Sequence, residues 1–208
     1  MTDLVLVRHG QTLWHAENRY AGSSDVGLTD VGLEQAEALG RWAATAGLDA
    51  IWSSPLSRAR LTAAACARTT GLEVGVDDRL TEAHFGAGEG LTAAEMEQAF
   101  PEARAAFVRD PVEHPLPGGE HPDVVADRFV AALHAASAAQ PAGTVLVVAH
   151  STAIRLAVCQ LVGIPLGSYR RVLPSLHNAA LTRLRVVGDG PAALLELNRP
   201  LEPKVSSS

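Results

Sequence analysis

Three short runs of apolar residues, at positions 4–7, 50–54 and 144–149, stand out along the chain. Continuous apolar runs of this length are typical of strands that are buried on both faces of a sheet. After each run, apolar residues recur at the spacing of one helical face. The helices predicted in this way begin at Thr29–Asp30, cover 57–70, fall within 120–139 and cover 153–162, and glycines at 47, 71 and 163 end three of them.

The alternation of strands and helices predicts an α/β fold, a three-layer sandwich in which helices flank a mostly parallel central sheet. Two further strands, 180–187 and 192–197, are joined by a Gly-Asp-Gly-Pro turn and make the sheet mixed. Short helical pieces broken by proline and glycine in about 82–120 predict a small cap-like insertion over one end of the sheet. We therefore expect a single domain over 1–208, with a flexible tail at 200–208.

Composition narrows the class of protein. The chain has 208 residues, of which 47% are hydrophobic, and a net charge of −6, so it can bury one core and does not suit sequence-independent nucleic-acid binding. No apolar run approaches the ~20 residues of a membrane span, and the N-terminus has no basic leader, so we expect a cytoplasmic protein. Arginine replaces lysine almost everywhere, as in GC-rich bacterial genomes. Cys66 and Cys159 lie apart in apolar helical stretches, and no Cys/His cluster predicts a metal site.

Two histidines and two arginines follow the predicted strands. Arg8 and His9 end the first strand, His150 ends the strand at 144–149, and Arg58 lies one helical turn after the strand at 50–54. Because ligands of open α/β sheets bind at the carboxyl ends of the strands, these four side chains are expected to converge. Arg8 beside His9 favours the neutral imidazole, which is the nucleophilic form. Cations that converge with little acid nearby form an oxyanion pocket, and phosphate is the expected guest.

The same residues carry a resemblance to a known family. Six segments, in order along the chain, resemble the sequence blocks of the histidine phosphatase superfamily, the phosphoglycerate mutase-like proteins: RHGQT at 8–12, then 22–36, 53–63, 80–90, PGGE at 117–120, and 147–155. RHG alone would be weak, but six ordered blocks over nearly the whole chain are specific. The resemblance implies the sandwich fold predicted above and a phosphohistidine intermediate without a cofactor or metal ion.

The resemblance also assigns roles. His9 resembles the nucleophile, Glu82 resembles the proton donor to the leaving oxygen, and the phosphate clamp would consist of Arg8, Arg58 and His150. The residues expected to bind substrate are Gln11, Thr12, Trp14, Asn18, Tyr20 and Ser151.

The remaining histidines are expected on loops or on the surface, at positions 15, 84, 114, 121, 134 and 177. Of these, His84 and His121 should border the pocket because they lie beside Glu82 and Glu120. The chain departs from the family pattern in two places, with Ser151-Thr152 where glycines are usual and His121 where serine is common. Both departures bear on substrate specificity.

These features favour a phosphatase that acts on a small phosphorylated metabolite. A phosphoglycerate mutase is the alternative, because 14–20 resembles the mutase substrate loop. The predicted insertion is acidic, which favours a substrate with one phosphate over a bisphosphorylated intermediate. A serine hydrolase built on Ser151 fails because no Asp or Glu lies between Ser151 and His177. A non-catalytic binding module would lack a catalytic residue, whereas all five expected positions are filled in this sequence. As for assembly, a homodimer is the state to expect first, because dimers are the commonest homo-oligomers.

Overall fold

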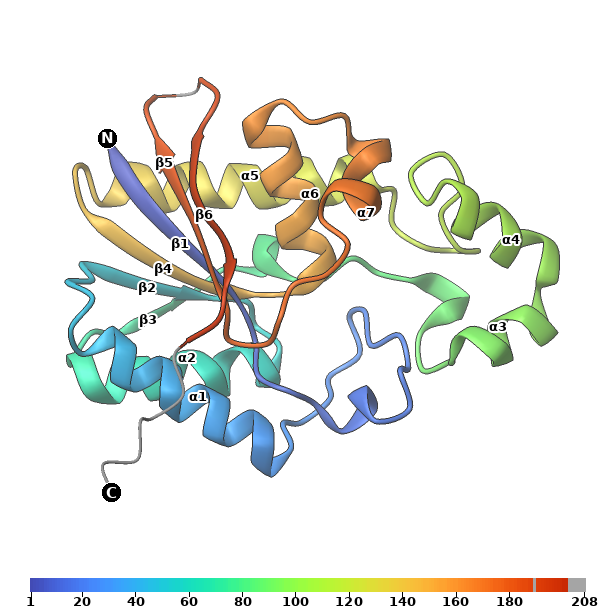
Figure 1. Ribbon diagram of the computed structural model, residues 1–208, viewed down its shortest axis with the longest axis horizontal. Coiled ribbons are helices and arrows are strands. Elements are labelled where there is room, and N and C mark those ends of the chain that lie inside the picture. Colours follow the sequence, from blue (N-terminus) through green and yellow to red (C-terminus); the bar gives the residue numbers. More distant parts are fainter. Residues whose placement is uncertain (189, 202–208) are drawn as a thin grey trace.

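The central element of the computed structural model is a six-stranded sheet with the order β3-β2-β4-β1-β5-β6 (Figure 1). The structure describes residues 1–188 and 190–201. The strands are β1 (Thr2–Arg8), β2 (Ala50–Ser53), β3 (Val74–Val76), β4 (Thr144–Ala149), β5 (Leu181–Val186) and β6 (Ala193–Arg199). The first four run parallel, and β5 is antiparallel to both β1 and β6. The predicted mostly parallel, mixed sheet is confirmed.

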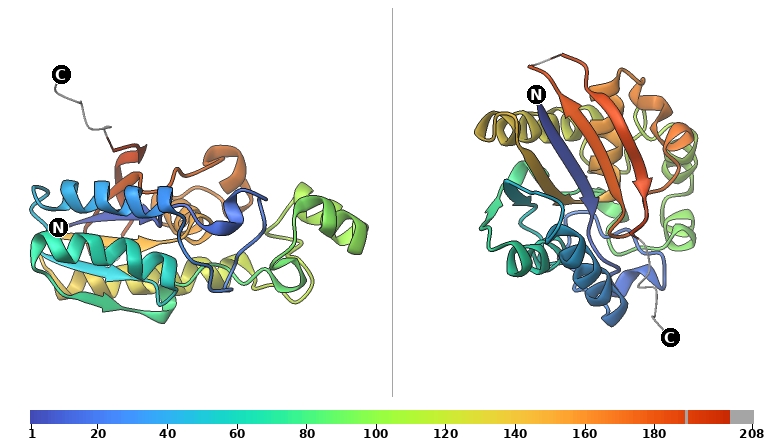
Figure 2. Two further views of the ribbon diagram at one scale, coloured as in Figure 1. Left: turned by 90° about the horizontal axis from the view of Figure 1, so that it is seen from below. Right: turned by 60° about the vertical axis from the view of Figure 1, so that its left-hand side comes forward.

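Helices cover both faces of this sheet (Figures 1 and 2). On one face, α1 (Asp30–Ala43) and α2 (Ser57–Thr70) pack over Val5 and Val7 of β1. On the other face, α5 (Pro122–Ala139) and α6 (Ser151–Val162) pack over the alternate residues of the same strand. The run at 4–7 is apolar throughout because both sides of β1 are buried in the hydrophobic core.

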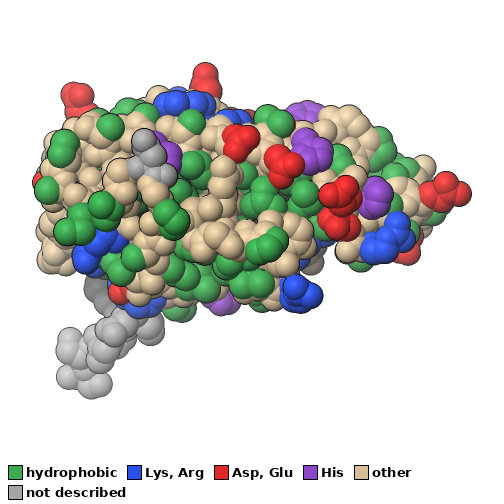
Figure 3. Space-filling view, turned by 90° about the horizontal axis from the view of Figure 1, so that it is seen from above, with side chains coloured by type: hydrophobic (Ala, Val, Ile, Leu, Met, Phe, Trp, Pro, Cys, Tyr) green, Lys and Arg blue, Asp and Glu red, His purple; other side chains and the backbone are tan. Residues whose placement is uncertain are grey.

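A small lobe of α3 (Ala93–Ala99) and α4 (Pro101–Arg109) extends from one end of the sandwich (Figures 1 and 2). It has its own small core, in which Met96, Phe107 and Leu116 are buried. The lobe falls within the segment expected as an insertion. Acidic side chains gather toward this end of the molecule on the face shown in Figure 3.

Several details differ from the sequence-based prediction. The α6 helix begins at Ser151 instead of 153, and α1 ends at Ala43, before the expected stop at Gly47. The edge strand β3 and the one-turn helix α7 (Tyr169–Val172) were not predicted, because three or four residues are too few to show a period. Of the predicted turn at 188–191, residue 189 lies outside the described residues, and so do residues 202–208 of the flexible tail expected at 200–208.

Both cysteines are free and buried, as the sequence predicts. Burial raises the pKa of the Cys66 thiol to about 12, so this side chain acts as a small apolar group. Within the described part of the chain, no helix is long and apolar enough to cross a membrane.

Candidate active site

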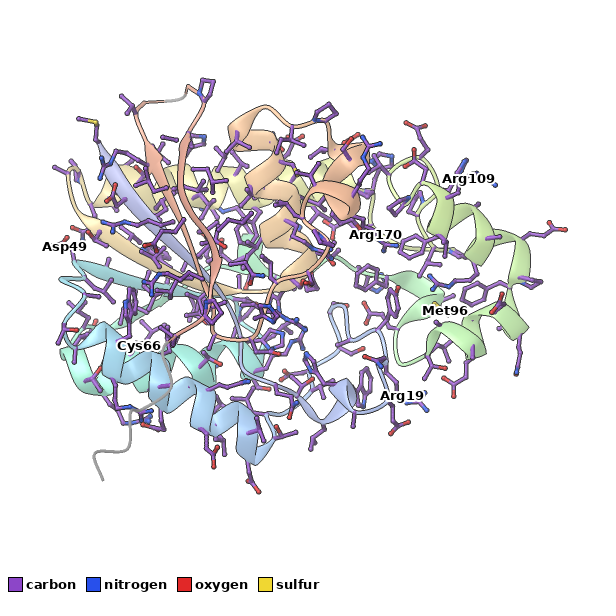
Figure 4. The ribbon with its side chains drawn as sticks, in the orientation of Figure 1. Arg19, Asp49, Cys66, Met96, Arg109 and Arg170 are labelled. Carbon is purple, nitrogen blue, oxygen red and sulfur yellow. The ribbon has the colours of Figure 1, made fainter. Side chains whose placement is uncertain are left out.

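A cavity of about 560 Å³ opens where β1, β2 and β4 end, between the sandwich and the lobe. Its wall is formed by the end of β1, the loop after β1, the start of α6 and the short helix α7 (Figure 4). The lining residues are Arg8, His9, Thr12, His15, Asn18, Arg19, Tyr20, Ala21, Gly22, Arg58, Glu82, Phe85, Ala93, Ser151, Thr152, Arg155, Arg170 and Pro174. Arg8, His9 and Arg58, three of the four predicted residues, therefore meet at this cavity, whereas His150 is fully buried behind it and is not a lining residue.

His9 is held as a neutral ring. Its Nδ1 lies 2.7 Å from the carbonyl oxygen of Gly10 and donates its proton there, which leaves the lone pair on Nε2. Burial, followed by the charges of Arg58 and Arg8, holds the pKa of His9 well below its ordinary value. The side-chain nitrogen of Asn178 donates to the carbonyl oxygen of His9 at 2.7 Å and fixes the backbone behind the ring. A neutral imidazole with a free Nε2 is the nucleophilic form.

The two arginines are anchored by backbone carbonyls. Arg8 donates to the carbonyl of Leu176 at 2.7 Å, and Arg58 donates to the carbonyls of Gly22 and Ser24, each at 2.6 Å. Burial lowers the pKa of Arg8 to about 10, and it also lowers the pKa of Arg58. Both groups still carry a full positive charge near neutral pH. Carbonyl oxygens fix their positions without cancelling that charge.

His150 completes the cluster from the end of β4. It is fully buried, its Nε2 lies 2.7 Å from the hydroxyl of Ser54, and its ring centre lies 5.1 Å from that of His9. Burial is the main cause that holds the pKa of His150 well below its ordinary value. In residues 1–188 and 190–201, five buried polar side-chain atoms lack a hydrogen-bond partner, and three of them are Arg8 Nε, Arg58 Nε and His150 Nδ1. Such atoms are rare in folded proteins, and an oxyanion supplies the acceptors that they need.

Glu82 lies at the N-terminus of α6. Its carboxylate is buried and accepts backbone N–H bonds from Ala83, Thr152 and Ala153 at 2.9 to 3.0 Å. The helix terminus and these donors stabilise the negative charge. Thr152 donates from its backbone N–H, so this hydrogen bond to Glu82 does not depend on the side chain at position 152.

His15 is a part of the site that sequence reasoning placed on a loop or the surface. Its Nε2 lies 2.5 Å from a terminal nitrogen of Arg8, and its Nδ1 lies 2.7 Å from the hydroxyl of Thr12. The guanidinium of Arg8 faces Nε2, and the backbone N–H of Thr12 donates to Nδ1 at 2.9 Å; because both groups can only donate, they favour the neutral ring over the imidazolium. Burial and the charge of Arg8 lower the pKa of His15 to about 4. His15 therefore positions Arg8 as a neutral acceptor.

Acidification is expected to destabilise the protein through these histidines. The unfolded chain binds protons near pH 6.5, whereas folded His15 does so only near pH 4, so the free energy of unfolding falls as the pH drops from about 6.5 to 4. His9 and His150 act in the same direction. Denaturant unfolding at pH 7.5, 6.5 and 5.5 measures this slope. His15→Asn, which cannot gain a proton, should make the slope shallower, and an unchanged slope would contradict the assignment.

Of the residues expected to bind substrate, Thr12, Asn18, Tyr20 and Ser151 line the cavity, whereas Gln11 and Trp14 do not. The side-chain oxygen of Gln11 accepts from the hydroxyl of Thr29 at 2.9 Å, which ties the loop after β1 to the start of α1.

Neither of the two histidines expected to border the pocket is among its lining residues. The ring of His121 instead caps α5. His84 Nδ1 accepts from the backbone N–H of Gly86 at 2.9 Å.

The loop after β1 passes very close to α1. A Cβ built on Gly10 would lie 2.4 Å from the carbonyl oxygen of Gly32, and one built on Gly32 would lie 2.1 Å from that of Gln11. Real Cβ atoms do not approach backbone oxygens so closely. The glycine of the RHG segment is thus required by packing against α1, next to the nucleophile.

No group of three or more His, Cys, Asp or Glu side chains that could hold a metal ion occurs in residues 1–188 and 190–201. The positive charge in the cavity comes from arginine side chains.

Known relatives share both the sequence and the fold. The chain is 38% identical over 201 residues to "Bifunctional protein Rv2228c" of Mycobacterium tuberculosis, a match that covers 95% of this chain and 54% of that protein. The chain thus spans about half the length of that relative. It is 34% identical over 169 residues to "Phosphoserine phosphatase 1" of Hydrogenobacter thermophilus, with 81% of this chain and 80% of the relative covered.

A mutase is also among the relatives. "Probable phosphoglycerate mutase GpmB" of Citrobacter koseri is 34% identical over 184 residues, which cover 88% of this chain and 85% of the relative. Among solved structures, the mycobacterial glucosyl-3-phosphoglycerate phosphatase Rv2419c, in complex with VO3, superimposes with a TM-score of 0.87. It is 32% identical, and the match covers 95% of this chain and 99% of that chain.

The sequence profile of one family covers nearly the whole chain. The profile described as "Histidine phosphatase superfamily (branch 1)" matches residues 4–199, which include the residues that line the cavity, most of β1 and the whole of the other five strands. The order of the sequence blocks, the fold and the relatives agree with this match. The protein therefore belongs to branch 1 of the histidine phosphatase superfamily.

Proposed function

We propose that this protein is a phosphatase that hydrolyses a small phosphorylated metabolite through a phosphohistidine. The main observation is the neutral His9 with a free Nε2, which lines the cavity together with Arg8 and Arg58, whose buried Nε atoms have no partner among the described residues. Phosphoryl transfer depends mainly on positioning and charge neutralisation, which the fixed arginines supply. Relatives named as phosphatases support the proposal.

In the first step, His9 Nε2 forms a bond to phosphorus while the ester P–O bond breaks. The electron pair of that bond stays on the leaving oxygen, which takes a proton from the Glu82 carboxylic acid and departs as an alcohol. Backbone donors stabilise the ionised carboxylate in the free protein.

In the second step, water attacks the phosphohistidine. The Glu82 carboxylate produced by the first step removes a proton from the water, a new P–O bond forms, and the P–N bond breaks. Its electron pair returns to Nε2 of His9, and inorganic phosphate leaves. Glu82 thus gives a proton to the leaving oxygen in the first step and takes one from water in the second, so Glu82 and His9 both return to their starting state.

The proposal favours hydrolysis over a mutase reaction. A mutase must retain a bisphosphorylated intermediate, which requires cations above the phosphohistidine. In the described part of the chain, the segment expected as a cap contributes Glu82, Phe85 and Ala93 to the cavity wall and no cation. The direct test compares phosphate release with conversion of 3-phosphoglycerate to 2-phosphoglycerate in a coupled assay. Conversion faster than phosphate release would overturn the phosphatase proposal.

Activity is expected to survive removal of metal ions. The proposed charge neutralisation comes from Arg8 and Arg58, so dialysis against EDTA should leave kcat within about twofold of its starting value. Phosphate release before dialysis, after dialysis and after addition of Mg²⁺ measures this. Loss of activity that Mg²⁺ restores would show that a metal ion takes part.

The substrate can be identified by measuring phosphate release from a panel of phosphorylated metabolites. A cytoplasmic location and a homodimer stay predictions.

A further inference from the structure

A second pair of arginines lines the cavity, away from the clamp at the strand ends. Arg155 comes from α6, and Arg170 comes from the short helix α7. In Figure 4, Arg170 lies at the edge of α7 that faces the α3–α4 lobe. Neither residue belongs to the five groups that carry the proposed phosphoryl transfer.

Both guanidinium groups are fixed around one buried aromatic ring. The centre of the Tyr169 ring lies 5.0 Å from the guanidinium carbon of Arg155 and 5.6 Å from that of Arg170. Arg170 Nε donates to the Tyr169 hydroxyl at 2.9 Å, and its guanidinium also lies 4.4 Å from the Phe107 ring centre. Cation–π contacts hold an arginine in place without neutralising its charge. Nη1 of Arg155 donates to two backbone carbonyls, whereas its Nη2 has one long contact, 3.5 Å to the Thr152 hydroxyl, so Nη2 can face a ligand together with the terminal nitrogens of Arg170.

The positive charge of this pair is not neutralised within the described residues. Arg155 is only 9% exposed and donates to the backbone carbonyls of Ser151, Leu173 and Pro174 at 3.1 to 3.2 Å. Neither Arg155 nor Arg170 forms an ion pair with a carboxylate in residues 1–188 and 190–201. By contrast, Arg19, the other arginine outside the clamp among the residues that line the cavity, is paired with Glu17 and Glu95.

Two like charges on one cavity wall repel each other unless an anion lies between them or beside them. The repulsion is felt locally, because Arg170 is one of the charges that lower the pKa of Arg155. Arg155 likewise contributes to the lowered pKa of Arg8, so Arg155 lies within electrostatic reach of the clamp. Burying such a pair in a pocket is unfavourable in the free protein, and a bound anion relieves it.

We propose that Arg155 and Arg170 form a second anion subsite, which binds a carboxylate on the same molecule whose phosphate occupies the clamp. The substrate class is therefore a phosphomonoester that also carries a carboxylate. This inference builds on the proposed phosphatase function and specifies its substrate. It also adds to the sequence-based argument for a substrate with one phosphate, which considered the acidic insertion and not the arginines of α6 and α7.

The test uses competition, so that binding can be read whether or not the probe is itself hydrolysed. Hydrolysis of p-nitrophenyl phosphate is measured in the presence of 3-phosphoglycerate or glycerol 3-phosphate. These two probes differ in one group, a carboxylate in the first and a hydroxymethyl group in the second. Hydrogen bonds between charged groups predict that 3-phosphoglycerate competes about tenfold to a hundredfold better.

Two variants of neighbouring residues sharpen the comparison. Arg170→Gln should reduce the preference for 3-phosphoglycerate at least tenfold, because it removes one cation and leaves the anchoring bonds of Arg155 intact. Arg171→Gln is the matched control: Arg171 is exposed, is not a lining residue and donates to the Ser168 hydroxyl, so the preference should stay at the wild-type value. Thermal unfolding verifies that both variants fold.

The outcomes separate the two proposals. Equal competition by the two probes in the wild type, or a preference that survives in Arg170→Gln, overturns the second subsite and leaves the phosphatase proposal standing. If the wild type does not hydrolyse p-nitrophenyl phosphate or any member of the metabolite panel, the phosphatase proposal fails. In that case titration calorimetry with the same two probes still measures the carboxylate preference.

Discussion

Replacing His9 with alanine is expected to reduce phosphatase turnover by a factor on the order of 10⁴ or more, because the group that forms the bond to phosphorus is lost. The hydrogen bond from His9 Nδ1 to Gly10 fixes the tautomer, so no other ring in the cluster offers a free lone pair in the same place. Steady-state phosphate release measures the loss. Mass spectrometry of the protein quenched in acid-free buffer should find one added phosphoryl group in the wild type and none in the variant.

His114→Ala is the matched control for this experiment. His114 is exposed in the segment after α4 and is not among the cavity-lining residues. Its substitution should leave both turnover and phosphorylation unchanged. The mechanism is wrong if His9→Ala keeps wild-type turnover, or if it still gains a phosphoryl group at the wild-type rate.

Glu82→Gln is expected to lower turnover of alkyl phosphates by about 10² to 10⁴, the usual range for loss of a general acid. The variant keeps the shape of the side chain but cannot release a proton to the leaving oxygen. Both carboxylate oxygens of Glu82 accept hydrogen bonds from backbone N–H groups. In the variant, the NH₂ group of the glutamine therefore faces an N–H donor and loses that hydrogen bond. The variant should therefore be less stable by about 1–3 kcal/mol, which denaturant unfolding measures.

The choice of substrate separates the two steps that Glu82 serves. The leaving group of p-nitrophenyl phosphate departs without a proton, so the variant should still phosphorylate His9 and then hydrolyse the intermediate slowly. A rapid-mixing experiment should find a burst of one p-nitrophenol per active site followed by a slow phase. Glu102→Gln, at an exposed position in the lobe, is the control. Absence of both a burst and a rate loss would remove Glu82 from the mechanism.

Much of the fold followed from sequence because β1 and β4 are buried on both faces and their apolar runs are uninterrupted. Those runs end at His9 and His150, so the strand-end rule placed the cluster at the correct edge of the sheet. The resemblance to the family supplied Glu82, which comes from a segment without regular periodicity. Such a residue reaches the cavity only through the tertiary fold.

The missed residues have physical reasons. The approach of His15 to Arg8 depends on the single turn from Leu13 to His15, which no periodicity reveals. Arg155 did leave a signal, since it is the one charged residue in the mostly apolar helix 151–162, and long charged side chains are seldom buried without a partner. Arg170 lies in the one-turn helix α7, and its place on the cavity wall required the structure.

The close approach of Gly10 and Gly32 limits how the active site can be redesigned. The two glycines are 22 positions apart in sequence, yet they lie at one contact. Gly10 faces the carbonyl oxygen of Gly32, and Gly32 faces the carbonyl oxygen of Gln11. A side chain at either position would separate α1 from the loop that carries the nucleophile. A mutagenesis library for new substrates should therefore keep both glycines fixed and vary Ser151 and Arg170, which line the cavity from α6 and α7 and lie outside that loop.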